Sequence, residues 1–502
     1  MNINRHRVVE VLTLTIIGLL IYINCRPLFA TNDSDKDASI TQGKKEQFAS
    51  FMATYQDRVV LLQSKFLIGI NELSRDITST PELNQKAFQI GNEELKKMVS
   101  AFVLSFPDAN NVEHSPLAQN ALAPAKYLAV AKYFKHAELE TELCGKIRQS
   151  SATTPLLLLL AKQCDSASPL TKLGAADVGW QFSEIDRKLL HDELSWFGDL
   201  LIYSSLSDNT PEKNKAYQDY IAQTKDFALS FSLFIGLFMI AFTLSIIALP
   251  IVVLQLVRGK FNFQLQRNPL AAPYLLETFA LYTGGMLLVG KVLGKLNLDL
   301  TSSNMLRLNI VIISSFGLFA LWPLLFNIRL RDLISTLGIP NLLPHRFLNE
   351  VCVGFFSYII YLPVMFVVLI LYSVLLTKFN IDPSSGTHPI VPLVTGESGG
   401  EDVFNLVFIL AVCVAPIIEE LMFRGAYYGW LRTRLPSFVA ILICAVTFAA
   451  VHPQGIIGIL PLTCVGVLLA FLREWRGTLT ASMTAHACNN ALMLSAVNYL
   501  FR

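Results

Sequence analysis

The sequence predicts an all-α, polytopic membrane protein of about eight or nine spans, with a mostly helical hydrophilic domain near the N-terminus. Of its 502 residues, 53% are hydrophobic and only 16% are charged, and the mean hydropathy is +0.48. These values lie outside the usual range of soluble proteins. From about residue 226 onward, apolar runs recur, each close to the roughly 20 residues that a helix needs to cross a bilayer.

Residues 1–30 are predicted to be a signal anchor or a signal peptide. Arg5 and Arg7 precede an apolar run at residues 8–23, an order found in both kinds of segment. Residues 28–30 read Leu-Phe-Ala and make a poor small-residue cleavage site. We therefore favour the uncleaved anchor, with the N-terminus in the cytoplasm.

Residues 31–225 have the composition of a soluble domain, and we expect this domain to be mostly helical. Apolar residues recur at three- and four-residue spacing in four stretches: 47–70, 93–106, 125–147 and 182–206. The histidines of the domain have no partner at a catalytic spacing: His114, His136 and His191. We therefore expect no catalytic site in this part of the chain.

Positive charge predicts the orientation of the spans. Beyond the N-terminal segment, eight apolar runs follow at residues 227–257, 273–293, 308–326, 351–376, 403–422, 438–451, 456–472 and 479–500. With the N-terminal segment counted as the first span, basic residues gather after the second, fourth, sixth and eighth spans. The positive-inside rule makes that side the cytoplasm, although Lys291, Lys295 and Arg307 oppose the rule.

This orientation makes the hydrophilic domain extracytoplasmic and the chain an integral protein of the plasma (inner) membrane. Cys144 and Cys164 lie within that domain. On an extracytoplasmic face they could form one disulfide, and two free buried thiols are the alternative. The formal net charge of +2, without a basic stripe, gives no reason to expect nucleic acid as a partner.

Two adjacent glutamates, Glu419 and Glu420, lie inside the apolar run at residues 403–422. Carboxylates in hydrocarbon are costly and are usually paired or directed into a watered cavity. Glu420 and Arg424 are four residues apart and can pair along one helix face. Glu419 points about 100° away around the helix and stays available to titrate. A site that needs one ionised structural carboxylate and one carboxylate for proton transfer would have this arrangement.

Two later apolar runs carry polar pairs at the same spacing. Phe448 and His452 are four apart, as are His486 and Asn490. Each pair alone is a weak signal, because a histidine or an asparagine in a span often does no more than form a hydrogen bond with a neighbouring helix. Together they favour a functional site, since polar groups on three helices close in sequence must find one another. A polar cluster that merely holds the helices together is the alternative.

These motifs, EExxxR, FxxxH and HxxxN in that order, resemble those of the CPBP (CAAX protease and bacteriocin-processing) family of intramembrane proteases. This family includes the type II CAAX prenyl endopeptidases. The resemblance covers roughly residues 402–500. It implies that residues 401–502 form a CPBP-like catalytic transmembrane core and that residues 226–400 add accessory transmembrane helices.

The resemblance also implies roles for individual residues. Glu419 would be the general base that activates water, and His452 would hold and polarise that water. His486 and Asn490 would stabilise the oxyanion. Glu420 and Arg424 match the structural pair of the family, and Phe448 matches its aromatic position. Amide hydrolysis needs a base, oxyanion donors and an acid for the leaving amine, and this set of side chains can supply all three.

Metal dependence is open at this point, because members of the family have been described both as metalloproteases and as glutamate proteases. Glu419, His452 and His486 could serve as three zinc ligands. The chain has no HExxH motif, the usual helical signal of a zinc protease. We prefer a metal-free glutamate mechanism without a cofactor.

The expected substrate is a membrane-anchored peptide or protein in the lipid bilayer. A non-catalytic scaffold or immunity protein of the same fold is the alternative, and a transporter is a third reading, although no internal repeat supports it.

Two structural questions follow from the predicted spans. His452 falls near the extracytoplasmic end of its span, whereas Glu419 and His486 fall toward the cytoplasmic half. The helix before Pro453 must therefore end inside the membrane, or the local topology must differ. Water must also reach the site, and we expect Pro416, Gly425 and Gly429 to mark where the glutamate helix opens to a cavity.

Overall fold

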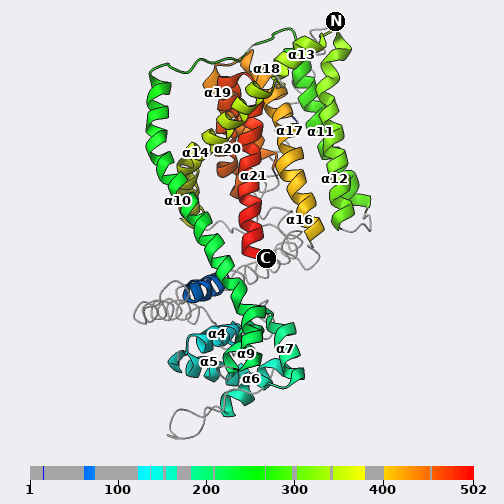
Figure 1. The fold of residues 1–502 in the computed structure, drawn as a ribbon. Coiled ribbons are helices and arrows are strands. Elements are labelled where there is room, and N and C mark those ends of the chain that lie inside the picture. The colour runs from blue at the N-terminus through cyan, green and yellow to red at the C-terminus, as the bar shows by residue number, and fades with distance from the viewer. Residues whose placement is uncertain are drawn as a thin grey trace. The chain divides into compact units, whose positions relative to one another are not determined.

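The computed structural model describes Thr15 and residues 62–73, 123–135, 137–150, 154–166, 182–206, 210–265, 267–296, 302–339, 343–378, 401–452 and 455–501. Within these ranges the chain is helical and has no β-strand (Figure 1). The predicted all-α architecture is confirmed. The predicted N-terminal segment, residues 1–30, lies outside the described residues apart from Thr15.

The chain divides into two compact units, and their boundary falls within one long helix, α10 (Ala222–Val257). One unit comprises Ile40–Phe238, and the other comprises Met1–Ser39 with Met239–Arg502. The domain boundaries predicted at residues 30, 225 and 400 stay predictions.

The unit Ile40–Phe238 is built from short helices around an apolar core. Beyond the helical residues 62–73, it contains α4 (Ala123–Tyr133), α5 (Ala137–Ser150), α6 (Pro155–Ser166), α7 (Glu184–Leu194), α8 (Trp196–Ser205), α9 (Pro211–Ala216) and the π-helical turn η3 (Tyr217–Ile221). A capping box starts α7, because Ser183 and Asp186 each accept a hydrogen bond from the other's backbone N–H. Leucines at helical spacing, such as Leu190 and Leu194, fill the core.

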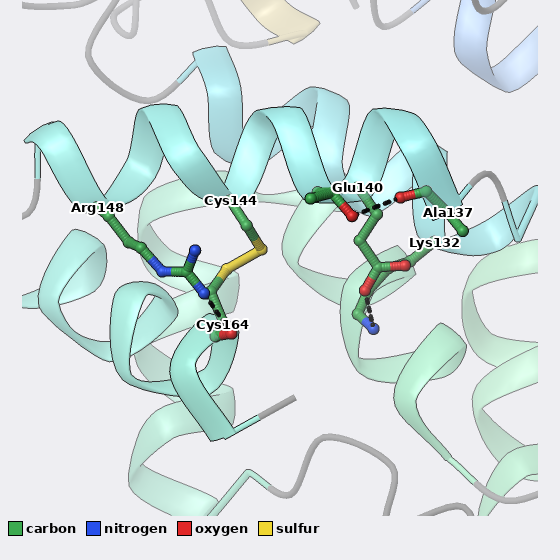
Figure 2. Close-up of a disulfide and its surroundings, with 7 residues drawn as sticks. Lys132, Ala137, Glu140, Cys144, Arg148 and Cys164 are labelled. Carbon is green, nitrogen blue, oxygen red and sulfur yellow. Dashed lines mark hydrogen bonds and ion pairs between the residues drawn. A yellow bond between two sulfur atoms is a disulfide. The ribbon is translucent and has the colours of Figure 1, made fainter. Parts of the chain in front are cut away.

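Cys144 of α5 and Cys164 of α6 form a disulfide, the first of the two alternatives that the sequence left open (Figure 2). Arg148 donates to the Cys164 carbonyl oxygen at 2.7 Å, so the same two helices are linked a second time. Lys132 and Glu140 form an ion pair of 2.9 Å next to this link. The disulfide therefore ties the central helices of this unit to each other.

His191 of α7 and Asp199 of α8 form an ion pair that the sequence did not reveal. The imidazole Nδ1 and the carboxylate Oδ1 are 2.9 Å apart. The hydrogen bond and the charge of Asp199 raise the pKa of His191, and burial raises the pKa of Asp199. The pair lies between two consecutive helices and lines no cavity described for the chain, so we interpret it as structural. His114 and His136 lie outside the described residues.

Six helical segments in the described part of the chain are long and apolar enough to cross a membrane: Pro211–Val257, Ala272–Val289, Leu306–Phe326, Pro344–Leu376, Val403–Arg432 and Gly458–Arg476. On α10 and on α14 (Pro344–Lys378), large apolar side chains such as Leu237 and Leu371 are exposed. Exposed rows of this kind are stable against lipid rather than against water. The chain is an integral membrane protein.

In the unit that contains Met239–Arg502, the helices described between residues 222 and 378 are α10, α11 (Ala272–Leu296), α12 (Ser302–Phe316), the 3₁₀ helix η4 (Gly317–Phe326), α13 (Leu330–Leu337) and α14. The helices described after residue 400 are α19 (Ser437–Ala450), α20 (Gly455–Arg476), α21 (Thr480–Phe501) and the segmented helix from Glu401 to Arg432. α11 packs against that segmented helix, where Phe279 stacks on Tyr427 with 4.5 Å between ring centroids. An accessory helix is thus fixed directly to the helix that carries the two glutamates.

That segmented helix changes its hydrogen-bond register twice. It consists of α16 (Glu401–Phe408), the π-helix η6 (Ile409–Val414), α17 (Ala415–Glu420), the π-helix η7 (Leu421–Tyr427) and α18 (Tyr428–Arg432). Pro416 lies in the first turn of α17 and has no N–H to continue the ladder. π-Helical turns are rare and occur frequently at functional sites. Here they flank the two glutamates.

α19 has 14 residues, so it is about 21 Å long and shorter than the roughly 30 Å hydrocarbon core. His452 follows directly after its end. A helix of this length is too short to cross that core alone, as the first of the two solutions for His452 requires, and its depth in the membrane stays a prediction. Gly466 of α20 allows close packing on α19, because a side chain at this position would meet the backbone of Ala445.

A buried arginine links α13, η7 and the turn between α20 and α21. Arg473 of α20 is fully buried and donates to three backbone carbonyls, those of Arg424, Thr336 and Gly477. Carbonyl partners at α13, η7 and the α20–α21 turn satisfy the guanidinium without a carboxylate. This cluster fixes the backbone of the glutamate helix at Arg424.

Candidate active site

The Glu420–Arg424 pair is fully buried. Arg424 Nη1 donates to Glu420 Oε1 at 2.8 Å, and both side chains are 0% exposed. Arg424 Nη2 also donates to the Gly466 carbonyl oxygen at 3.4 Å, and the guanidinium lies 4.3 Å from the Phe448 ring centroid. A buried charge held by an ion pair, a carbonyl and an aromatic face has a fixed position.

His486 connects this buried pair to Glu419. Its Nδ1 lies 3.0 Å from Glu420 Oε1, and its Nε2 lies 3.8 Å from Glu419 Oε2. Because the Arg424-paired carboxylate only accepts hydrogen bonds, His486 Nδ1 carries the hydrogen. The Nε2 atom is therefore the one presented to Glu419, and Glu420 sets the orientation of the ring.

His452 reaches the same carboxylate from the end of α19. Its Nδ1 lies 2.6 Å from the Phe448 carbonyl oxygen, so this nitrogen donates and Nε2 faces Glu419 Oε2 at 3.9 Å. Phe448 packs against both imidazoles, with ring centroids at 4.5 Å from His452 and 5.7 Å from His486. The aromatic ring thus holds the two imidazoles on either side of one carboxylate oxygen.

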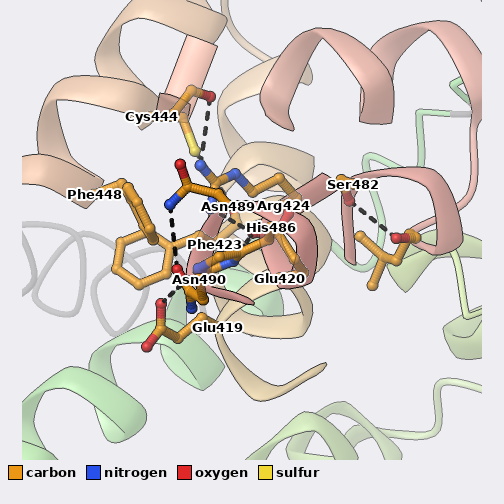
Figure 3. Close-up of polar contacts among 12 residues, drawn as sticks. Glu419, Glu420, Phe423, Arg424, Cys444, Phe448, Ser482, His486, Asn489 and Asn490 are labelled. Atoms are coloured by element: carbon orange, nitrogen blue, oxygen red, sulfur yellow. Dashed lines mark hydrogen bonds and ion pairs between the residues drawn. The ribbon is translucent and has the colours of Figure 1, made fainter. Parts of the chain in front are cut away.

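Glu419 differs from Glu420 in exposure and in lacking an arginine partner among the described residues. Its side chain is 22% exposed, and among the described residues its Oε2 has no hydrogen-bond partner. Figure 3 shows Glu419 at the edge of the cluster that contains Glu420, Arg424 and His486. A buried polar atom without a partner needs an explanation, and a carboxylate oxygen facing two imidazole nitrogens is suited to handle a proton.

Asn490 lies on α21, one turn beyond His486. Its Nδ2 donates to the Ala411 carbonyl oxygen at 2.7 Å, and the neighbouring Asn489 Nδ2 donates to its Oδ1 at 3.3 Å. Asn489 was not singled out from the sequence, because an asparagine outside the HxxxN spacing carries no motif signal. Its hydrogen bond to the Asn490 side chain became visible only in the three-dimensional structure.

One cavity of about 630 Å³ brings the candidate residues together. Glu419, His452, His486 and Asn490 all line it, with Phe448 and Asn489 beside them. Away from these groups its wall is mainly apolar and includes Leu410, Leu462, Val465, Met493, Leu494 and Val497. A largely apolar pocket with a few convergent polar groups is the usual form of a ligand site.

The accessory helices complete this cavity. Tyr282, Thr283, Met286 and Leu287 of α11 and Ile313 of α12 form part of its wall. No sequence motif marks these residues, and residues 226–400 were expected only to accompany the core. The pocket is therefore built jointly by the C-terminal helices and by α11 and α12.

The expected openings at Gly425 and Gly429 are wrong, because neither residue lines the cavity. A side chain at Gly425 would lie 3.1 Å from the Leu337 carbonyl oxygen, and one at Gly429 would lie 3.2 Å from Leu275. Both glycines serve close helix packing instead. Pro416 lies next to Ala415, which does line the cavity.

The donor atoms of Glu419, His452 and His486 are chemically suitable for zinc. Donors at about 2.0 Å around a tetrahedral zinc lie about 3.3 Å from one another, whereas the two distances from Glu419 Oε2 are 3.8 and 3.9 Å. Among the described residues no group of three His, Cys, Asp or Glu side chains has the arrangement of a metal site. The ligand chemistry fits and the spacing is slightly wide, so the preference for a metal-free site stays a prediction.

Comparison with known families finds a match, which lies in the C-terminal region. Residues 402–492 match the family described as type II CAAX prenyl endopeptidase Rce1-like, and this match confirms the resemblance to the CPBP family. The matched range contains all seven motif residues and excludes α11 and α12. Searches of curated proteins and of solved structures found no match. Over residues 402–492, the C-terminal region is thus similar to the CAAX-type intramembrane protease family.

Proposed function

We propose that this chain, with its Rce1-like region at residues 402–492, is an intramembrane endopeptidase that hydrolyses a peptide bond of a membrane-associated substrate. The observation that carries the proposal is Glu419 Oε2, which lies in the cavity without a hydrogen-bond partner among the described residues and faces two imidazole nitrogens. Glu420 also has one oxygen, Oε2, without a hydrogen-bond partner among the described residues, but its Oε1 is held by Arg424 and His486 and its side chain does not line the cavity.

In the proposed reaction, Glu419 removes a proton from a water molecule that His452 Nε2 helps to hold. The water oxygen attacks the peptide carbonyl carbon, and the carbonyl oxygen gains negative charge. Asn490 donates an N–H to this oxyanion, and His486 donates through Nε2 when it is protonated. Glu420 at His486 Nδ1 fixes the orientation of the ring, so that Nε2 faces the cavity. The C–N bond then breaks, and Glu419 returns its proton to the leaving amine.

The apolar cavity wall supports a substrate that enters from the bilayer. A charged or fully hydrated segment would lose its hydration in a pocket of this composition, whereas an apolar or lipid-linked segment would not. The disulfide between Cys144 and Cys164 supports the proposed extracytoplasmic position of the hydrophilic unit, because disulfides persist in oxidising compartments. The N-terminus would then be cytoplasmic and the membrane the plasma (inner) membrane.

Zinc is the alternative to the metal-free mechanism. Glu419, His452 and His486 would hold it, and the bound ion would supply a water of lowered pKa. In that case Glu420 would orient His486, and the Phe448 carbonyl would orient His452, as outer partners of metal ligands do.

The test uses the purified chain in lipid vesicles with an internally quenched, farnesylated peptide ending in Cys-aliphatic-aliphatic-X. In parallel, newly formed peptide N-termini are compared between membranes that contain the wild type and membranes that contain Glu419→Gln. This comparison can identify a natural substrate even if the farnesylated peptide is not cleaved. Glu419→Gln and His452→Ala should each abolish cleavage, and Glu350→Gln, outside the cavity, should not. Cleavage that persists in Glu419→Gln would reject the proposed mechanism, whereas a wild-type chain that cleaves neither the peptide nor any membrane protein would favour a scaffold.

Chelation separates the two mechanisms in the same preparation. A strong chelator should leave wild-type cleavage unchanged, and elemental analysis of the purified chain should find far less than one zinc per chain. Loss of cleavage that added zinc restores would replace the glutamate mechanism with the zinc mechanism.

A further inference from the structure

We propose that Pro416 and Asn489 are positioning residues that together fix the side-chain amide of Asn490, so that its free N–H faces the reacting carbonyl. This inference rests on the proposed function, since it explains how one of the proposed oxyanion donors is oriented. Neither residue is assigned a role by the family motifs.

Pro416 makes one backbone carbonyl available to Asn490. At the end of η6 the ladder has π-helical register, because the Ala415 N–H donates to the Leu410 carbonyl oxygen five residues back. The π-helix ends at Val414 and α17 begins at Ala415; if the π-register continued by one residue, a donor at position 416 would meet the Ala411 carbonyl oxygen. Proline has no N–H, so that bond is missing from the ladder. Asn490 Nδ2 supplies the missing donor at 2.7 Å.

Asn489 fixes the other half of the same amide. A carbonyl oxygen only accepts, so the Ala411 oxygen requires the nitrogen of the Asn490 amide on its side. The Asn490 oxygen must then point the other way, where Asn489 Nδ2 donates to it at 3.3 Å. Asn489 Oδ1 is in turn within 3.5 Å of the Tyr358 hydroxyl of α14. Every group in this chain of contacts has a defined donor and acceptor direction.

The Asn490 amide therefore cannot rotate by 180° without losing these hydrogen bonds. One Asn490 hydrogen is used by Ala411, and the Asn490 side chain borders the cavity, so the second hydrogen remains for a substrate oxygen. If the amide flipped, its oxygen would face both the Ala411 carbonyl and the developing oxyanion, and both contacts would be repulsive. Preorganised donors contribute because they need no reorientation during the reaction.

Pro416→Ala tests the first half of the proposal with the cleavage assay described above. The restored N–H competes with Asn490 for the Ala411 oxygen, so kcat should fall by about 10- to 100-fold while KM stays within about twofold. Pro250→Ala in α10 removes another helix proline away from the cavity and should change neither constant. Unchanged kcat in Pro416→Ala would overturn the role of Pro416.

Asn489→Leu tests the second half, in a double-mutant cycle with Asn490→Ala. Asn490→Ala should lower kcat by about 10²- to 10³-fold, the usual loss for an oxyanion donor. Asn489→Leu should lower kcat by about 10- to 100-fold alone and cause no further loss in the Asn490→Ala background. Thermal unfolding of each variant in detergent identifies any loss of folded protein, and rates are expressed per folded chain.

The outcomes separate the inference from the function on which it rests. If Asn490→Ala retains wild-type kcat, the proposed oxyanion role of Asn490 is wrong. If Asn490→Ala is impaired but Asn489→Leu is not, or if the two losses multiply, Asn489 does not act through Asn490 and this inference is wrong.

Discussion

Removal of Arg424 should destabilise the protein strongly, because it leaves Glu420 as an uncompensated buried charge. Both side chains are 0% exposed, and Nη1 and Oε1 are 2.8 Å apart. Breaking a buried ion pair from one side typically costs about 3–5 kcal/mol. Arg424→Met keeps most of the side-chain volume, so the expected loss comes from charge rather than from a cavity. At about 1.4 kcal/mol per tenfold change, this lowers the folded-to-unfolded ratio by about 10²- to 10⁴-fold.

The assay is denaturant unfolding of the purified chain in detergent micelles, with Glu420→Gln and the double variant measured beside Arg424→Met. Glu420→Gln should also cost several kcal/mol, because it leaves the Arg424 charge buried. The double variant should cost clearly less than the sum of the two single variants. Asp332→Asn breaks the exposed Arg329–Asp332 pair and should cause no measurable change.

Two results would refute this reasoning. A loss below about 1 kcal/mol for Arg424→Met would place the pair in the range of exposed ion pairs. Additive losses in the double variant would show that the two charges do not stabilise each other. In either case Glu420 could no longer be called the structural member of the two glutamates.

Three further predictions concern other parts of the molecule. Met286→Trp should fill part of the cavity and raise KM, or change peptide preference, by at least about tenfold. Leu288 lies on the same helix and is 65% exposed, so Leu288→Trp should change neither quantity. Equal effects of the two variants would exclude α11 from the site. The raised pKa of His191 means that its ion pair stabilises the folded unit below pH of about 6.5 and stops doing so as pH rises through the raised value. His191→Gln should therefore flatten the decline of the unfolding midpoint between pH 6 and 8, and an unchanged slope would contradict the pairing. Replacing Cys144 and Cys164 by serine opens a loop with a sequence separation of 20 and should destabilise the unit Ile40–Phe238 by about 3 kcal/mol, which the protease resistance of this unit measures. Cleavage of the peptide substrate by the membrane unit should persist.

The helices and the polar motif residues were predictable because their signals are local in sequence. Helical periodicity and span length identify apolar helices without knowledge of their neighbours. The four-residue spacing of Glu420 and Arg424 already placed them on one face, and the cost of buried charge required partners for Glu419, His452 and His486. The geometry of one helix and the solvation of charge are sufficient to predict these features.

The remaining features depend on contacts between segments far apart in sequence. Tyr282 and Met286 line the cavity because Phe279 fixes α11 on η7, and no motif encodes that packing. Arg473 is satisfied by backbone carbonyls, whose positions the sequence does not state. The link from Asn490 to Ala411 requires the π-helical register before Pro416, and hydrophobic periodicity does not distinguish π from α turns over so few residues.

The central claim is that Glu419 performs the chemistry and Glu420 holds the site together. The most direct test measures cleavage per folded chain and unfolding free energy for Glu419→Gln and Glu420→Gln in the same lipid preparation. We predict that Glu419→Gln abolishes cleavage and changes the unfolding free energy by less than about 1 kcal/mol, whereas Glu420→Gln loses about 3–5 kcal/mol. Cleavage by folded Glu419→Gln at the wild-type rate would contradict the claim.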